Sequence, residues 1–150
     1  MKTMGAVVAG REVYHVRVEQ SVREAARYMT ERRVGAVAVL ESKNRLAGIL
    51  SERDLMGRVI AKGLDPDATR VADVMTRDLV VAHAGESHED GVRKMKQVGC
   101  RHLPVVDGDR LVGMVSLRDL MQVDLSEKDD EIRWLNAYIH FIPPGREGTS

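Results

Sequence analysis

Apolar and polar residues follow two different periods along the first half of the chain. Residues 12–18 are rich in side chains that favour strands, and apolar residues alternate with polar ones toward the end of the segment, which predicts a strand. Over residues 22–32 they recur at i, i+3, i+4 and i+7 behind a Ser21–Glu24 capping pair, which predicts a helix. The continuous apolar run at residues 35–40 predicts a strand that is buried on both faces.

A further strand and helix follow in the first half of the chain, and the second half repeats the whole series. Residues 46–50 predict the next strand, and residues 52–62 predict a second helix that ends near Gly63. Matching patterns in the second half predict a strand at 79–84, a helix at 88–98, strands at 103–106 and 111–115, and a helix from 118. The predicted order is therefore βαββα, written twice.

One segment makes the repeat explicit. Residues 45–56 (RLAGILSERDLM) and 110–121 (RLVGMVSLRDLM) are identical at eight positions, with a constant offset of 65. Each copy runs from an apolar strand into a Ser-x-x-Asp sequence and a helical pattern, so the chain presents a strand-to-helix corner twice. We call residues 45–56 corner one and residues 110–121 corner two.

The repeat sets the predicted domain organisation. We predict a first repeat over residues 10–64, a linker around Pro66 over 65–71, a second repeat over 72–124, a C-terminal helix over 126–142 and a disordered tail over 143–150. A repeat of about 60 residues is too small to bury both faces of its sheet, so the two must pack together. The predicted fold is a mixed α/β (α+β) pair with the corners facing each other across a pseudo-two-fold axis.

Composition excludes several classes of partner. Lys+Arg and Asp+Glu both number 23, so no net basic field is available for nucleic acid. The apolar runs are too short to span a bilayer, and the N-terminal stretch is too short for a secretory signal. The single cysteine, Cys100, excludes an intramolecular disulfide and fits a reducing compartment. We expect a cytoplasmic protein with no nucleic acid or membrane partner.

Both corners carry the same three polar residues: Ser51, Arg53 and Asp54 in corner one, and Ser116, Arg118 and Asp119 in corner two. The Ser-x-x-Asp spacing is that of a helix cap, and capping alone accounts for both residues. However, Asp is shorter than the usual Glu or Gln partner, and the arginine before it has no capping role. A carboxylate there can also accept hydrogen bonds from a ribose diol, while the hydroxyl, the helix amides and the arginine receive phosphate.

The doubled motif resembles the signature of CBS domains, which take their name from cystathionine β-synthase. The resemblance rests on a strand, Gly48, Ser51 and Asp54, and on the duplicate that runs from Gly113 to Asp119. Residues 71–76 (VADVMT) and 102–107 (HLPVVD) match further parts of the pattern, and 133–139 (RWLNAYI) resembles the tail of small stand-alone bacterial and plant-organelle members. The resemblance to CBS domains covers about residues 10–123.

This resemblance implies a regulatory module that binds an adenine nucleotide or adenosyl ligand: AMP, ADP, ATP, NAD(H) or S-adenosylmethionine. Asp54 and Asp119 would hold the ribose, with Ser51 and Ser116 beside it, and adenine would lie between apolar strands. The ligand would signal to a partner through a conformational change.

The resemblance also places Arg101 and His102 near the cleft and its phosphates. The first repeat has Gly35 and Ala36 at the corresponding positions, so corner two is expected to be the better phosphate site. An ordinary, partly buried role fits His102 equally well.

Two other functions stay open. A structural or dimerisation scaffold would use the charged residues of the corners in salt bridges. An enzyme acting on a nucleotide has less support, because no nucleophile is paired with a base by spacing and no Gly-rich phosphate loop with Lys occurs. We predict no catalytic residue and no required cofactor. Four histidines share no metal-ligand spacing, so no metal site is predicted: His15, His83, His88 and His140.

The predicted C-terminal helix, capped by Ser126, is apolar on two sides. One stripe contains Ile132, Leu135 and Ile139, and the other contains Trp134, Tyr138 and Phe141. Such a helix needs a neighbour on each side. Either both neighbours belong to the same chain, or one of them is a second copy of the chain in a homodimer. Because no effector domain is present, we expect the signal to be read by the partner subunit or by an unidentified regulated protein.

Overall fold

The computed structural model describes residues 2–139, with only the backbone of the last two. The first half contains α1 (Met4–Val8), β1 (His15–Arg17), α2 (Val22–Arg32), β2 (Ala36–Glu41), η1 (Ser42–Asn44), β3 (Arg45–Ser51), α3 (Glu52–Asp54) and η2 (Leu55–Ile60). The second half contains α4 (Val71–Val74), β4 (Ala82–His83), α5 (His88–Val98), β5 (His102–Asp107), β6 (Arg110–Ser116) and α6 (Leu117–Ile139).

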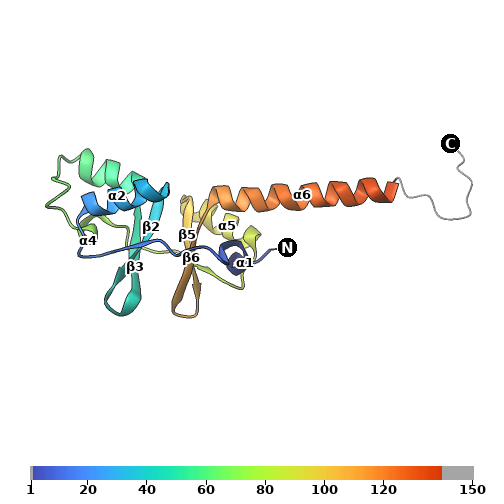
Figure 1. Cartoon of the computed structure of the whole chain (residues 1–150), viewed down its shortest axis with the longest axis horizontal. Coiled ribbons are helices and arrows are strands. Elements are labelled where there is room, and N and C mark those ends of the chain that lie inside the picture. Colours follow the sequence, from blue (N-terminus) through green and yellow to red (C-terminus); the bar gives the residue numbers. More distant parts are fainter. Residues whose placement is uncertain (1, 140–150) are drawn as a thin grey trace, which may run out of the picture.

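The strands form two sheets of three, one from each repeat, with the orders β1-β2-β3 and β4-β5-β6. In both sheets the first strand runs parallel to the second and the second antiparallel to the third. The pairing register of the two antiparallel strands also shifts at corresponding places, after Val39 in the first sheet and after Val105 in the second. The two hairpins lie side by side (Figure 1). Residues from both hairpin turns line a cleft between them. The predicted βαββα pair is confirmed.

The core of each repeat includes a short helix that lies outside the predicted bounds of that repeat. Val71 and Val74 of α4 are buried in the core of the first repeat, although we predicted that the second repeat begins at residue 72. Met4 and Val8 of α1, which lay outside both predicted repeats, are buried in the core of the second repeat. The spatial units therefore differ from the sequence repeats at both boundaries.

Two glycines in the sheets allow these helical segments to approach. A Cβ at Gly48 of β3 would lie 2.7 Å from the Thr76 carbonyl oxygen, and one at Gly113 of β6 would lie 2.7 Å from Val8 Cβ. Contacts this short are not tolerated, so a side chain at either position would push the covering segment away. The repeated glycine of the motif thus serves close packing.

The helices that follow the two corners differ in length and type. After corner one, the short α3 passes into the π-helical η2. After corner two, α6 runs without a break to Ile139 and extends away from the rest of the molecule (Figure 1). The predicted separate helix from residue 126 is wrong, because the sequence between 117 and 139 contains neither Gly nor Pro to end α6. The predicted helix end and tail beyond 139 lie outside the described residues.

Most of the projecting part of α6 is exposed to solvent. Leu120 and Val123 pack into the core of the second repeat, whereas Ile132, Trp134 and Leu135 are exposed. Between residues 2 and 139, none of the helices is long and apolar enough to cross a membrane.

Candidate functional site

Both corners are helix starts with reciprocal caps. In corner one the Ser51 hydroxyl accepts a hydrogen bond from the Asp54 N–H at 3.2 Å, and Asp54 Oδ2 accepts one from the Ser51 N–H at 2.9 Å. In corner two Ser116 and Asp119 exchange the same two bonds, at 3.1 and 2.9 Å. Asp is therefore long enough to close the capping box, and capping is confirmed as one role of these residues.

The carboxylate of corner one is enclosed by other groups of the protein. Asp54 is buried, and its Oδ1 accepts a hydrogen bond from the Thr76 hydroxyl at 3.1 Å. The same oxygen lies 3.7 Å from Arg58 Nη1, which also donates to the carbonyls of Val74 and Met75 at 2.8 and 2.9 Å. Asp54 therefore ties α3 and η2 to the segment after α4, and both of its oxygens have partners.

The carboxylate of corner two is more open. The Asp119 side chain is 27% exposed, and Arg11 Nη1 lies 3.1 Å from its Oδ2. Burial raises the pKa of Asp119, but hydrogen bonds from the Ser116 backbone and from Arg11 outweigh that effect and leave the pKa below its ordinary value. Asp119 is thus a carboxylate at neutral pH, and its Arg11 partner is a half-exposed side chain.

A cleft of about 1020 Å³ opens in front of corner two. It is lined by the predicted site residues of the second repeat: Arg101, His102, Ser116, Arg118 and Asp119. Ser51, Arg53 and Asp54 are not among the residues that line it, although their neighbour Glu52 is. The structure therefore brings the predicted residues of the second repeat together and leaves those of corner one outside.

The first repeat contributes residues that sequence reasoning missed: Arg11, Tyr14, Arg33 and Glu52. A hint was present for Glu52, because it faces Leu117 in the aligned corners and is the one mismatch there that is not apolar against apolar. Glu52 lies over Gly35, where a Cβ would be 2.6 Å from its Oε1. The absence of a side chain at Gly35 thus makes room for an acidic group in the cleft.

The cleft has a mixed but mainly cationic lining. Four arginines, Arg11, Arg33, Arg101 and Arg118, stand against three acids, Glu12, Glu52 and Asp119. Burial lowers the pKa of His102, and the nearby charges of Glu52 and Asp119 only partly oppose this, so the imidazole is neutral at pH 7. Arginines beside the capped carboxylate of Asp119 form a lining that suits a ligand with both hydroxyl and phosphate groups.

Comparison with known proteins agrees with the doubled architecture. The family model of the CBS domain matches residues 6–61 and 71–126. The chain belongs to the CBS domain family. It is 31% identical over 143 residues to the CBS domain-containing protein CBSX3, mitochondrial, of Arabidopsis thaliana, a match that covers 93% of this chain and 69% of the relative.

Solved structures of CBS proteins share the fold. A protein with CBS domains from Burkholderia ambifaria aligns with a TM-score of 0.78 at 30% identity, covering 83% of this chain and 95% of the other. CBSX2, solved in complex with AMP, aligns with a TM-score of 0.72 at 26% identity, covering 85% and 99%. CBS pair proteins are regulatory modules, and the predicted family and fold are confirmed.

Proposed function

We propose that this chain is a regulatory module that binds an adenine nucleotide in the cleft at corner two. One observation carries the proposal: the cleft gathers Ser116, Asp119 and several arginines in front of a helix start whose carboxylate stays open. The AMP bound by CBSX2 supports the ligand class. Enzymatic turnover is not part of the proposal.

Each part of the ligand has a group suited to it. The Asp119 carboxylate accepts hydrogen bonds from the ribose hydroxyls after Arg11 has moved aside. Arg101 and Arg118 contact the phosphate, and Arg11, which lines the same cleft, is a third candidate once its pair with Asp119 is broken. Because the N–H of Leu117 donates to the Arg101 carbonyl at 2.8 Å, Arg101 is held at the start of α6. AMP, ADP, ATP, NAD(H) and S-adenosylmethionine all share the adenosyl part, so an experiment must choose among them.

A thermal-shift panel of these five ligands tests the proposal. A ligand that binds only the folded state at a hundredfold excess over its Kd adds about 2.7 kcal/mol to the stability. We expect at least one ligand to raise the Tm of the native chain and of Asp54→Ala, and none to raise the Tm of Asp119→Ala. If no ligand raises the Tm of the native chain, nucleotide binding is wrong and the scaffold function takes its place.

The enzyme alternative needs its own measurement. Incubation of the chain with each nucleotide overnight, followed by mass spectrometry, detects any product. A regulatory module leaves every nucleotide intact, whereas turnover that Asp119→Ala abolishes would establish an enzyme.

We also propose that the module acts as a homodimer. The helices after the two corners expose the same pair of apolar positions: Met56 and Ile60 at 68% each, and Met121 and Leu125 at 57% each. These pairs correspond at the constant offset of 65, so the two repeats present equivalent apolar patches that a second copy is able to cover. A nucleotide that prefers one arrangement of the repeats would then alter the dimer or a surface read by another protein.

Analytical ultracentrifugation tests the dimer. We expect a dimer at micromolar concentration and a monomer after Met121→Glu with Leu125→Glu. Lys128→Glu, a charge change on the same helix outside the patch, is the control and should stay dimeric. A native chain that sediments as a monomer with and without AMP would contradict the dimer. The cytoplasmic location stays a prediction, and the Arabidopsis relative is a mitochondrial protein.

A further inference from the structure

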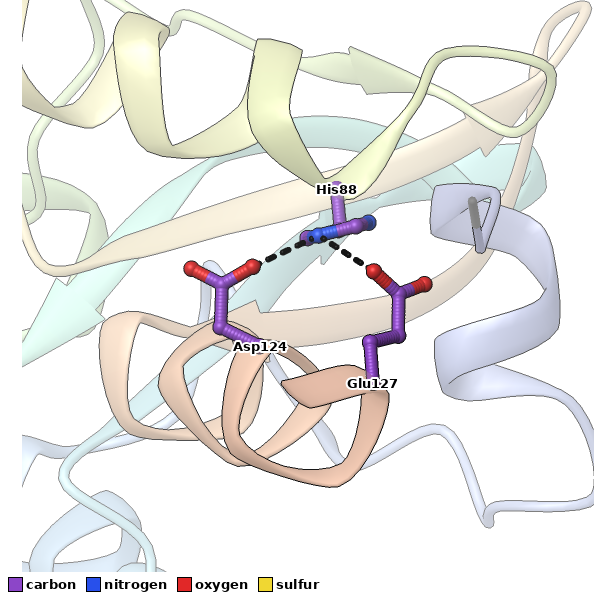
Figure 2. A group of neighbouring side chains, drawn as sticks. All are labelled: His88, Asp124 and Glu127. Atoms are coloured by element: carbon purple, nitrogen blue, oxygen red, sulfur yellow. Dashed lines mark hydrogen bonds and ion pairs between the residues drawn. The ribbon is translucent and has the colours of Figure 1, made fainter. Parts of the chain in front are cut away.

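A buried histidine with two carboxylates lies outside the nucleotide cleft, between α5 and α6. His88 is the first residue of α5 and is 0% exposed. Its ring points toward α6, where Asp124 and Glu127 stand one turn apart on the facing side (Figure 2). None of the three lines the cleft at corner two, so nucleotide binding does not explain them.

The three side chains converge on one point. His88 Nε2 lies 2.8 Å from Asp124 Oδ1 and 3.6 Å from Glu127 Oε2. All three potential ligand atoms lie within 4.8 Å of one another. Around a tetrahedral zinc ion with bonds of about 2.0–2.1 Å, ligand atoms are separated by about 3.3 Å, so only small shifts would admit an ion. The two carboxylates are partly exposed, at 48% for Asp124 and 41% for Glu127, so water can reach the point where they meet His88.

The other ring nitrogen of His88 is already oriented. Nδ1 lies 3.3 Å from the backbone carbonyl oxygen of Lys2, to which an Nδ1–H donates. This bond directs Nε2 at the two carboxylates, the arrangement in which a metal-ligating histidine is held by a backbone acceptor behind it. Burial lowers the pKa of His88, but the hydrogen bonds to Asp124 and to Lys2 outweigh it and leave the pKa raised.

We propose that His88, Asp124 and Glu127 bind one divalent transition-metal ion of the zinc class. An imidazole nitrogen with two carboxylate oxygens suits Zn²⁺ better than Mg²⁺ or Ca²⁺, which prefer sites made entirely of oxygen. Water completes the coordination. The ion replaces the Nε2 proton and ties α6 to α5, while Lys2 links the site to the N-terminal segment. The spacing of histidines predicted no metal site, because the ligands come from helices 36 residues apart in the sequence.

The alternative is a metal-free ion pair between protonated His88 and the two carboxylates. Both arrangements use the same atoms, and they differ in their response to added metal. An ion pair gains nothing from Zn²⁺, whereas a metal site is stabilised by it in proportion to the logarithm of its concentration above Kd.

The test is a zinc titration of the full, tag-free chain after treatment with a chelator. We expect calorimetry to show one Zn²⁺ per chain, a raised Tm, and a tetrahedral visible spectrum when Co²⁺ replaces Zn²⁺. Asp124→Asn and Glu127→Gln should each weaken Zn²⁺ binding at least tenfold, and His88→Ala should abolish it. Since His88→Ala removes a buried side chain, the two carboxylate variants keep the test valid if that variant does not fold.

Exposed acids on the same helix supply the control. Asp129→Asn and Asp130→Asn each remove one negative charge, as each test variant does, and each should leave the zinc affinity unchanged. No stoichiometric Zn²⁺ binding by the native chain, or binding that Asp124→Asn and Glu127→Gln leave intact, would overturn the proposal. AMP binding is measured on the same samples, so failure of the metal site is distinguishable from failure of the nucleotide site.

Discussion

Corner one and corner two have nearly the same sequence and the same capping geometry, yet their aspartates lie in different surroundings. Asp54 is enclosed by Thr76 and Arg58, whereas Asp119 meets the half-exposed Arg11 beyond its cap and faces a cleft. The motif itself thus supplies a helix start in both places. Residues from other parts of the chain determine whether the aspartate at that helix start is enclosed or accessible to a ligand.

The difference is traceable to two pairs of corresponding positions. At the offset of 66 that holds before the hairpin turn, Thr76 corresponds to Gly10, which has no hydroxyl to offer Asp119. At the offset of 65 that holds after it, Arg58 corresponds to Val123, a buried apolar residue of α6. The second repeat therefore lacks both groups that engage Asp54, and a ligand is able to take their place.

The largest effect that separates the corners should be on stability. Asp54→Ala removes a buried carboxylate that caps α3 and is shared by Thr76 and Arg58, so we expect a loss of about 3 kcal/mol in the free energy of unfolding. Asp119→Ala removes a more exposed cap and should lose about 1 kcal/mol. Urea denaturation followed by circular dichroism measures both. Equal losses would mean that the two aspartates are equivalent.

The close approach at the two motif glycines should give the next largest effect. Gly48→Ala places a Cβ against a backbone carbonyl and Gly113→Ala places one against the stiff Val8 side chain, so each should cost about 2 kcal/mol. Gly57→Ala is the control, since nothing lies within 4 Å of its Cβ and Ala favours a helix. Thermal denaturation should show lower Tm values for the first two variants alone. An unchanged Tm at Gly113 would contradict the packing of α1.

A smaller contrast concerns the paired arginines and AMP. Arg118 lines the cleft and Arg53 does not, so Arg118→Ala should weaken AMP binding about tenfold by removing a charged hydrogen bond worth about 1.4 kcal/mol. Arg53→Ala should leave the affinity within about twofold, because an exposed charge at a distance is screened. Fluorescence competition with a labelled nucleotide gives both values. A stronger effect at Arg53 would move the site to corner one.

The smallest effect is on the titration of Asp119. The carboxyl has a pKa below its ordinary value in the folded chain, so its contribution to stability is present above the unfolded pKa of about 3.9 and is lost as pH falls through the lower folded pKa. Arg11→Ala removes one cause and should raise this pKa toward its ordinary value. Carboxyl ¹³C NMR titration of both proteins measures it. No change in Arg11→Ala would show that the pair does not form in solution.

The sequence was sufficient for the elements with strong local signals. Residues 22–32 and 88–98 have regular apolar spacing and capping serines, and α2 and α5 occupy those ranges. The repeated corners located both capping boxes. Capping and apolar periodicity are set by residues that are close together in the sequence, so these elements could be predicted without knowledge of the rest of the fold.

Long-range packing could not be predicted in the same way. Nothing near Val8 or Val74 indicates that α1 completes the second repeat and α4 the first, because that exchange depends on the glycines of distant strands. Glu52 and Arg11 likewise enter the cleft through contacts between repeats. The sequence therefore predicted the cleft residues that come from the second repeat, but not those that the first repeat contributes.

Calorimetric titration of AMP into the native chain, Asp54→Ala and Asp119→Ala tests the central claim most directly. If corner two alone forms the nucleotide site, the native chain binds one AMP, Asp54→Ala keeps that stoichiometry with an affinity within about threefold, and Asp119→Ala loses about 3 kcal/mol, more than a hundredfold in Kd. Two AMP molecules per native chain, or a loss in Asp54→Ala equal to that in Asp119→Ala, would contradict it.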